Sequence, residues 1–160
     1  MTTVNFKGNP VKIAGNLPKV GTKAPDFELV SQNLERLHLE HFAGKKLLLN
    51  IFPSMDTDVC AKSVRTFAEK MNPDFIVLNI SLDLPFAAKR FCSANALNAQ
   101  TLSAYASTFA DDYGVRILEG PLKGLCARAV IVLDADHKVA YVELVPEITQ
   151  EPDYDACLKA

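Results

Sequence analysis

One cysteine, Cys60, occupies the position in this sequence where a thiol is most easily made reactive. It ends the run Pro53-Ser-Met-Asp-Thr-Asp-Val-Cys60, which follows the apolar stretch Lys46–Phe52. That stretch predicts a buried β-strand, and the residues from Thr57 onward have helical periodicity. A thiol at a strand-to-helix junction lies near unpaired backbone N–H groups and the positive end of the helix dipole, which favour the thiolate. Because the thiolate is the nucleophilic form, Cys60 is the best candidate for nucleophilic chemistry.

The other three cysteines, Cys92, Cys126 and Cys157, are widely spaced. Cys126 precedes a predicted strand and Cys157 lies in a predicted helix, where free cysteines usually pack as small apolar residues. The chain has no Cys-x-x-Cys pair, and the pair His38 and His41 matches neither zinc-binding helix pattern, so both histidines are expected in exposed loops. We therefore expect neither a disulfide-stapled scaffold nor a metal or other cofactor.

Length, composition and charge restrict the class of protein. With 160 residues, 49% of them hydrophobic, residues 1–160 are expected to form a single domain with a sizeable core. The net charge of −2 provides no basic excess for nucleic acid or anionic lipid. No apolar run approaches the ~18 residues of a membrane span. The N-terminal residues lack the apolar segment of a secretory signal, so the expected location is cytoplasmic.

Apolar periodicity predicts alternating strands and helices around Cys60. The strand ending at Phe52, the helix after Thr57 and a second buried strand should form a right-handed βαβ unit with parallel strands. The elements in chain order are a hairpin at 4–14, a strand at 46–52, a helix from Thr57 to Asn72-Pro73, a strand at 75–80, a helix from 83–85, a loop-rich middle, strands at 128–134 and 138–144, and a helix at 153–158. This order predicts an α/β, thioredoxin-like fold, with a central mixed sheet flanked by helices and an added N-terminal β-hairpin.

Four segments of the chain, in this order, resemble the motifs of one known family. They are Pro53-x-x-x-Thr57-x-x-Cys60, the run from Ser81 to Cys92, the run from Gly120 to Val130, and the run from Glu147 to Tyr154. The first resembles the active-site signature of peroxiredoxins. The other three narrow the resemblance to the bacterial thiol peroxidases, the atypical two-cysteine members of that family. The likeness covers nearly the whole chain, beginning with the N-terminal hairpin.

The resemblance implies a thiol-specific peroxidase that reduces hydrogen peroxide and alkyl hydroperoxides to water and alcohols. Cys60 matches the peroxidatic cysteine, which becomes a sulfenic acid, and Cys92 matches the resolving cysteine of an intrachain disulfide that thioredoxin reduces. Thr57 and Arg128 match residues that hold and polarise the peroxide and the thiolate, and Pro53 matches one that shields the pocket from water. The family also implies a homodimer.

Physical reasoning gives Thr57 and Arg128 roles that do not depend on the resemblance. Thr57 is suited to cap the helix through its hydroxyl, which can also donate to a reacting oxygen. Arg128 begins a buried strand, where an unpaired guanidinium is costly, so it should either stabilise the Cys60 thiolate or form a structural salt bridge. Asp58 departs from the family pattern and places an acid near Cys60, an effect that solvent screens if Asp58 is exposed.

Two classes of function remain open. One is the peroxidase. The other is a peroxide-sensing switch or holdase in which oxidation of Cys60 alters a partner interaction with little turnover. A generic thiol–disulfide oxidoreductase is disfavoured, because such proteins usually contain Cys-x-x-Cys.

Overall fold

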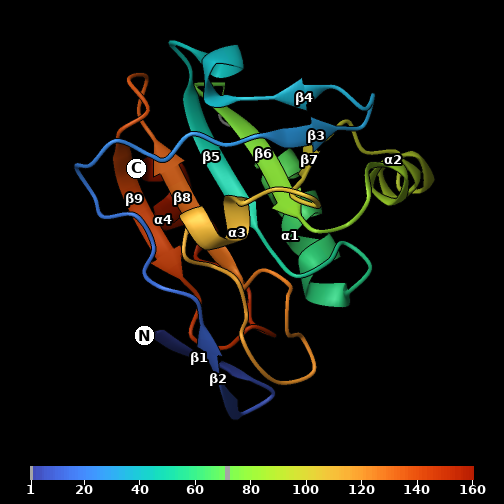
Figure 1. Ribbon diagram of the computed structural model, residues 1–160. Helices are drawn as coiled ribbons and strands as arrows, with labels where there is room; N and C mark the ends of the chain where they lie inside the picture. Colours follow the sequence, from blue (N-terminus) through green and yellow to red (C-terminus); the bar gives the residue numbers. More distant parts are fainter. Residues whose placement is uncertain (1, 71–72) are drawn as a thin grey trace.

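The computed structural model describes residues 2–70 and 73–160, which form a seven-stranded mixed sheet and a separate hairpin (Figure 1). The strand order in the large sheet is β4-β3-β7-β6-β5-β8-β9. β5 pairs with β6 and β6 with β7 in parallel, whereas the remaining neighbours are antiparallel. The strands are β3 (Leu29–Ser31), β4 (Arg36–Leu37), β5 (Lys46–Ile51), β6 (Phe75–Ser81), β7 (Thr101–Ser103), β8 (Ala129–Leu133) and β9 (Val139–Leu144).

The predicted βαβ unit is confirmed, with α1 (Asp58–Glu69) connecting the parallel strands β5 and β6. The end predicted for this helix falls partly on Asn72, which lies outside the described residues. The second helix, α2 (Pro85–Ala94), begins with a proline in its first turn, as expected, since the missing N–H costs nothing there. The unit therefore brings Cys60 to the start of one helix and places the next helix after the neighbouring strand.

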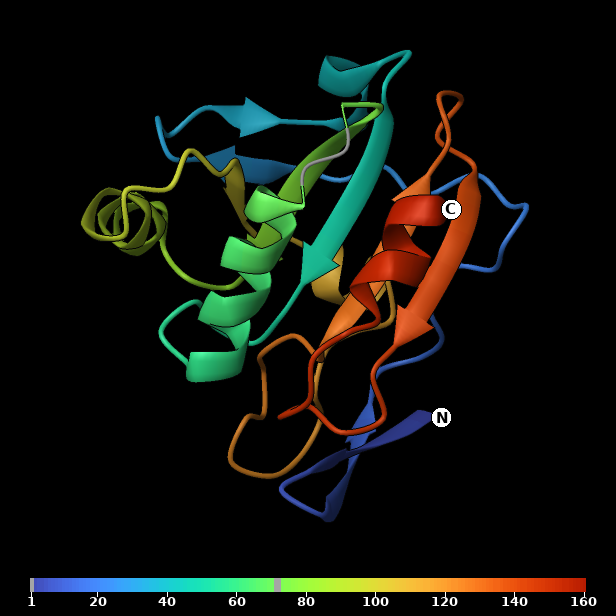
Figure 2. The ribbon, with the colours of Figure 1, turned by 180° about the vertical axis from the view of Figure 1, so that it is seen from behind.

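Alternation along the buried strands supplies both faces of the sheet with apolar side chains. Leu47 and Leu49 of β5 belong to a core cluster that includes Phe109 of the short helix α3 (Phe109–Asp112). Leu48 belongs to a cluster on the other face, with Phe67 of α1 and Cys157 of α4 (Tyr154–Lys159). Figure 2 shows α1 and α4 in front of the same face of the sheet. The thioredoxin-like arrangement predicted from the sequence is thus present.

The N-terminal hairpin pairs β1 (Thr2–Phe6) with β2 (Asn9–Ile13). Lys7 and Gly8 form its turn with φ of 50° and 83°, the positive values of the tight turns that suit a twisted hairpin. The carboxylate of Glu147 accepts hydrogen bonds from both turn amides, at 3.1 and 2.8 Å. The hairpin is therefore fastened to the segment that follows β9.

Several short elements were missed by the sequence analysis. The middle of the chain contains β7 and α3 where only loops were predicted, and the strands β3 and β4 and the 3-10 helix η1 (Leu39–Phe42) were not predicted either. Elements of two to four residues show too few apolar positions for a period to be recognised. No helix in the described part of the chain is long and apolar enough to cross a membrane.

Candidate active site

The Cys60 thiol lies in the first turn of α1 and is fully buried. Its apolar cluster contains Phe52 at the end of β5, Met55 in the loop before α1, Val64 one turn further along the helix, and Ala88 of α2. The site is therefore formed by the loop between β5 and α1 together with the start of both helices.

Arg128 is the charged partner of this thiol. It directly precedes β8, is only 2% exposed, and its Nη2 donates to the sulfur of Cys60 at 3.0 Å. Its Nε donates to the carbonyl of Ile148 at 2.7 Å, which fixes the plane of the guanidinium. Its Nη1 is buried and has no hydrogen-bond partner among the described residues. No ion pair joins Arg128 to a described carboxylate, so the salt-bridge interpretation finds no support.

Thr57 occupies the N-cap of α1, but the predicted capping by its hydroxyl is wrong. The backbone there is extended, as a cap requires, yet the side chain caps no amide of the first turn. The hydroxyl instead donates to the carbonyl of Ser54 at 2.9 Å, which directs the side chain back toward the preceding loop. Asp58 is exposed, so solvent screens its charge, and Pro53 is buried.

Cys92 lies in α2 with contacts different from those of Cys60. Gln32 donates to its sulfur at 3.6 Å, and the carbonyl of Ala99 lies 3.9 Å from that sulfur. Burial raises the pKa of the Cys92 thiol, while the hydrogen bond from Gln32 opposes this shift. Cys60 and Cys92 are both free thiols in this structure. The role of Gln32 was not predicted, since an isolated glutamine in a loop gives no sequence signal.

Cys126 and Cys157 are buried as expected for small apolar residues. Burial, with a smaller contribution from Asp83, raises the pKa of the Cys126 thiol to about 12. Burial and then the nearby Glu143 carboxylate raise the pKa of the Cys157 thiol to about 12. Neither thiol ionises near neutral pH, so neither environment suits a nucleophile.

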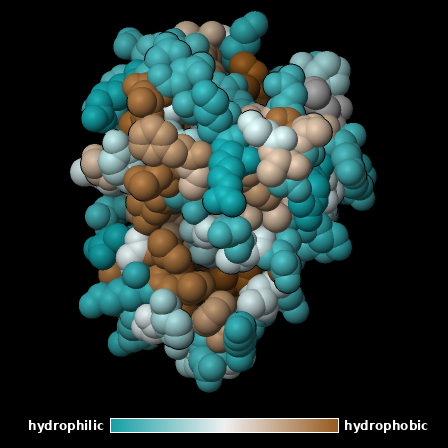
Figure 3. All heavy atoms as spheres, turned by 90° about the vertical axis from the view of Figure 1, so that its right-hand side faces the viewer, coloured by the Kyte–Doolittle hydropathy of each residue, from teal (hydrophilic) through white to brown (hydrophobic). Residues whose placement is uncertain are grey.

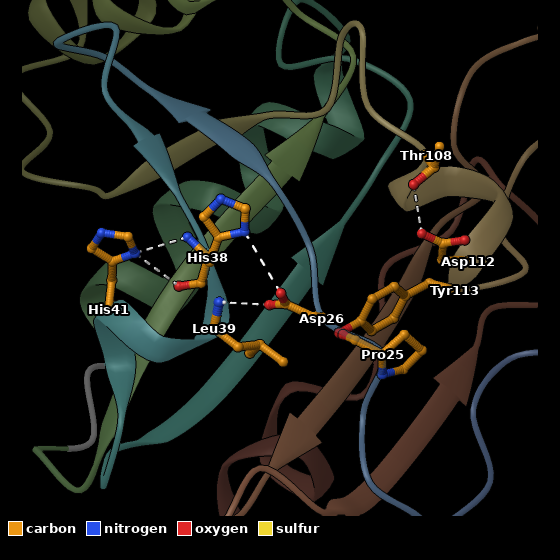
Figure 4. Close-up of polar contacts among 8 residues, drawn as sticks. All are labelled: Pro25, Asp26, His38, Leu39, His41, Thr108, Asp112 and Tyr113. Carbon is orange, nitrogen blue, oxygen red and sulfur yellow. Dashed lines mark hydrogen bonds and ion pairs between the residues drawn. The ribbon is translucent and has the colours of Figure 1, made fainter.

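His38 directly precedes η1 and His41 lies within it, so the expected loop position of His41 is wrong (Figure 4). The backbone N–H of His38 donates to Nδ1 of His41 at 2.9 Å, and Nδ1 of His38 lies 3.6 Å from Asp26. Within residues 2–70 and 73–160, no three His, Cys, Asp or Glu side chains are grouped so that they could hold a metal ion. A hydrogen bond to the backbone therefore accounts for the position of the His41 ring, and the His38 ring lies beside Asp26.

Comparison with known proteins identifies the family. A family model for redoxins matches residues 19–158, which include the sheet, α1, α2 and all four cysteines. The chain belongs to the redoxin family. The N-terminal hairpin and the residues directly after it precede the matched region, and residues 159–160 follow it.

Individual relatives indicate the kind of redoxin more closely than the family model does. Thiol peroxidases from Mycobacterium tuberculosis and Mycobacterium bovis are each 51% identical to it, over 100% of this chain and 98% of theirs. The solved structure of a peroxiredoxin-like protein from Aquifex aeolicus superposes with a TM-score of 0.93 at 42% identity, covering 99% of this chain and 95% of that one. A thiol peroxidase from Chromobacterium violaceum has a TM-score of 0.90 at 27% identity, with the same coverage. The chain is thus a peroxiredoxin-type enzyme.

Proposed function

We propose that this enzyme reduces hydrogen peroxide and alkyl hydroperoxides through Cys60. The thiolate sulfur attacks one oxygen of the peroxide, the O–O bond breaks, and the leaving oxygen takes a proton to become water or an alcohol. Cys60 is oxidised by two electrons to a sulfenic acid. The 3.0 Å hydrogen bond from the buried guanidinium of Arg128 to the Cys60 sulfur is the observation that supports this most directly.

Arg128 is suited to act on both the nucleophile and the leaving group. A cation in a dry site stabilises negative charge far more than it does in water. Nη2 is directed at the sulfur, while Nη1 is buried and makes no bond to the described residues, so it can donate to a peroxide oxygen. The Ile148 carbonyl holds the group in place before the substrate binds.

Thr57 and Pro53 complete the proposed site. The Thr57 hydroxyl proton is directed at the Ser54 carbonyl, so its oxygen can accept a hydrogen bond from the O–H of a peroxide. Buried Pro53 lacks an N–H and adds an apolar wall that limits the entry of water. The apolar neighbours of Cys60, such as Phe52 and Met55, are compatible with alkyl hydroperoxides as well as hydrogen peroxide.

Cys92 is the proposed resolving cysteine. Its thiol attacks the sulfur of the Cys60 sulfenic acid, a disulfide forms, and water leaves. A disulfide requires Cα atoms about 4.4–6.8 Å apart, and the two thiols begin in different sets of contacts on separate helices. The raised pKa of the buried Cys92 thiol also disfavours attack until that thiol becomes exposed. Local unwinding of a helix should therefore precede resolution, after which a cytoplasmic thioredoxin reduces the disulfide.

A homodimer is part of the proposal. The view of the molecule from the α2 side shows apolar side chains gathered in a broken band (Figure 3). Phe86 and Leu84, at the start of α2, are 67% and 50% exposed. Large apolar side chains that are exposed together often form protein interfaces. Sedimentation equilibrium should give twice the chain mass for the wild type and a smaller mass for Phe86→Asp.

The decisive experiment is steady NADPH consumption in the presence of thioredoxin, thioredoxin reductase and a hydroperoxide. Hydrogen peroxide, cumene hydroperoxide and tert-butyl hydroperoxide would each be compared at equal concentration. Continuous turnover is expected. Oxidation of one equivalent with no further NADPH consumption would contradict the enzymatic proposal and favour the sensor. Cys126→Ser is the matched control, because its thiol is buried in the core and has no proposed role.

A further inference from the structure

Asp83 connects the two segments that contain the functional cysteines. It lies between the end of β6 and the start of α2, and its half-buried carboxylate accepts three hydrogen bonds. The Ser54 hydroxyl donates to Oδ1 at 2.7 Å, and the Met55 amide and Ser81 hydroxyl donate to Oδ2 at 2.8 and 2.7 Å. Two of these donors belong to the loop that leads into α1. One side chain therefore joins that loop to the segment leading into α2.

The bonded residues determine the shape of the loop. Ser54 Oγ accepts from the Asp56 amide at 3.1 Å, and the Ser54 carbonyl accepts from the Thr57 hydroxyl at 2.9 Å. The position of Thr57 therefore depends on Ser54, which Asp83 holds. Charge-assisted hydrogen bonds of this kind are shorter and stronger than neutral ones.

Met55, which follows Ser54 in the loop, connects Asp83 to the Cys60 sulfur through packing. Met55, whose amide is bonded to Asp83, is buried in one cluster with Cys60 and with Ala88 of α2. Phe91 of α2 packs against the same cluster. Beside these contacts, the loop and α2 also line a pocket of about 370 Å³, which Asp83 borders. The hydrogen bonds of Asp83 and the packing of Met55 therefore both contribute to the connection between the loop and α2.

We propose that Asp83 is a positioning residue, an inference that rests on the proposed function. Its hydrogen bonds to Ser54 and Met55, which we call the latch, hold the loop 53–57 against the start of α2. With the latch closed, Thr57 and the first turn of α1 remain where a peroxide meets Cys60. With the latch open, the ends of α1 and α2 are free to bring Cys60 to Cys92. The latch favours the first chemical step and slows the second.

The Asp83→Asn substitution tests this because it keeps the volume of the side chain. It replaces one acceptor oxygen with an NH₂ group, which only a hydroxyl that turns to accept can bond, and it removes the negative charge that strengthens all three bonds. Stopped-flow mixing with one equivalent of peroxide and intact-mass analysis of quenched samples would give two rate constants. The oxidation of Cys60 is expected to slow about tenfold, the equivalent of one charged hydrogen bond. Formation of the Cys60–Cys92 disulfide is expected to accelerate.

Excess peroxide provides a second readout. The Cys60 sulfenic acid is then either oxidised to a sulfinic acid, while a second peroxide is reduced to water or alcohol, or converted to the disulfide with release of water. A loose latch slows the former and accelerates the latter. The sulfinic share of Asp83→Asn should therefore be smaller than that of the wild type.

Two further variants separate the latch from loss of stability. In Asp134→Asn the same chemical change affects a carboxylate that accepts from the Asp136 and Lys138 amides in the β8–β9 turn. Neither rate constant should change there. Ser54→Ala removes the hydroxyl bond to Asp83 without changing the charge, and should shift both rate constants in the same directions as Asp83→Asn. If Asp83→Asn fails to fold, Ser54→Ala provides the test.

The outcomes distinguish the latch from the proposed function. If the disulfide forms in Asp83→Asn and Ser54→Ala no faster than in the wild type, the latch proposal is wrong. It is also wrong if Asp134→Asn changes the two rate constants as much as Asp83→Asn does. If the wild-type chain itself forms no Cys60–Cys92 disulfide with peroxide, the proposed function fails, and the latch fails with it.

Discussion

Replacing Arg128 with methionine should reduce peroxidase activity far more than it reduces the amount of folded protein. The substitution removes the Nη2 bond to the Cys60 sulfur at 3.0 Å and the unpaired Nη1 donor. A hydrogen bond to a charged group is worth about 1.5–3 kcal/mol, and about 1.4 kcal/mol corresponds to a factor of ten in rate. Loss of the thiolate contact alone therefore predicts a fall in kcat/KM of about 10- to 150-fold.

The stability of the Arg128→Met variant has to be measured beside its activity. The Ile148 carbonyl would lose its bond from Nε, and an unsatisfied buried acceptor costs about 1–3 kcal/mol of folding free energy. Urea unfolding would give this cost. Activity would be assayed under conditions where the variant is fully folded, with Arg116→Met as control, since Arg116 makes an exposed ion pair with Asp111.

A lysine at position 128 should restore part of the activity, because it provides a cation but not a planar group that bonds Cys60 and Ile148 together. A fully folded Arg128→Met variant with the same kcat/KM as the wild type would refute the role assigned to the guanidinium. Equal activity of the lysine and methionine variants would refute the contribution of its charge.

The remaining predictions concern the cysteines and the N-terminal hairpin. Cys60→Ser should abolish NADPH consumption in the coupled assay, and retained activity would exclude this thiol as the nucleophile. Cys126→Ser and Cys157→Ser should keep nearly full activity, and the native protein should not react with a thiol reagent at these positions at pH 8, since burial raises both pKa values to about 12. Hydrogen bonds from the Thr149 and then the Gly8 amide lower the pKa of Glu147 below its ordinary value of 4.5. Its stabilising effect should therefore be complete above pH 4.5 and disappear as the pH falls through the lowered value, so that Glu147→Gln lowers the urea midpoint at pH 7 but not in strong acid.

The sequence predicts the elements around Cys60 well because their patterns are long. Strand β5 is apolar after Lys46 except for Asn50, α1 shows clear helical periodicity, and α2 begins at a proline. The N-terminal hairpin was also predicted, with bounds close to those of β1 and β2. In contrast, β7 and α3 are three and four residues long, and tertiary pairing rather than local pattern stabilises them.

Contacts between distant segments were harder to predict from the sequence. The pairing of Arg128 with Cys60 joins residues 68 positions apart, and burial of an arginine indicates a partner without indicating which one. Thr57 was assigned as a helix cap from local preference, but its hydroxyl donates to the Ser54 carbonyl and caps no amide of the first turn. Asp83 was noted only within a motif and at the start of a predicted helix, because its three bonds depend on how the β5–α1 loop folds back.

The contrast among the buried cysteines shows why burial alone does not determine reactivity. Cys60, Cys126 and Cys157 are all fully buried. Burial raises the pKa of the Cys126 and Cys157 thiols. The carboxylate of Asp83 adds to this shift at Cys126, and that of Glu143 adds to it at Cys157. Cys60 instead accepts a hydrogen bond from the guanidinium of Arg128. A buried thiol can act as a nucleophile when a fixed cation replaces the water that would otherwise stabilise its anion, and this is the role proposed for Arg128 beside Cys60.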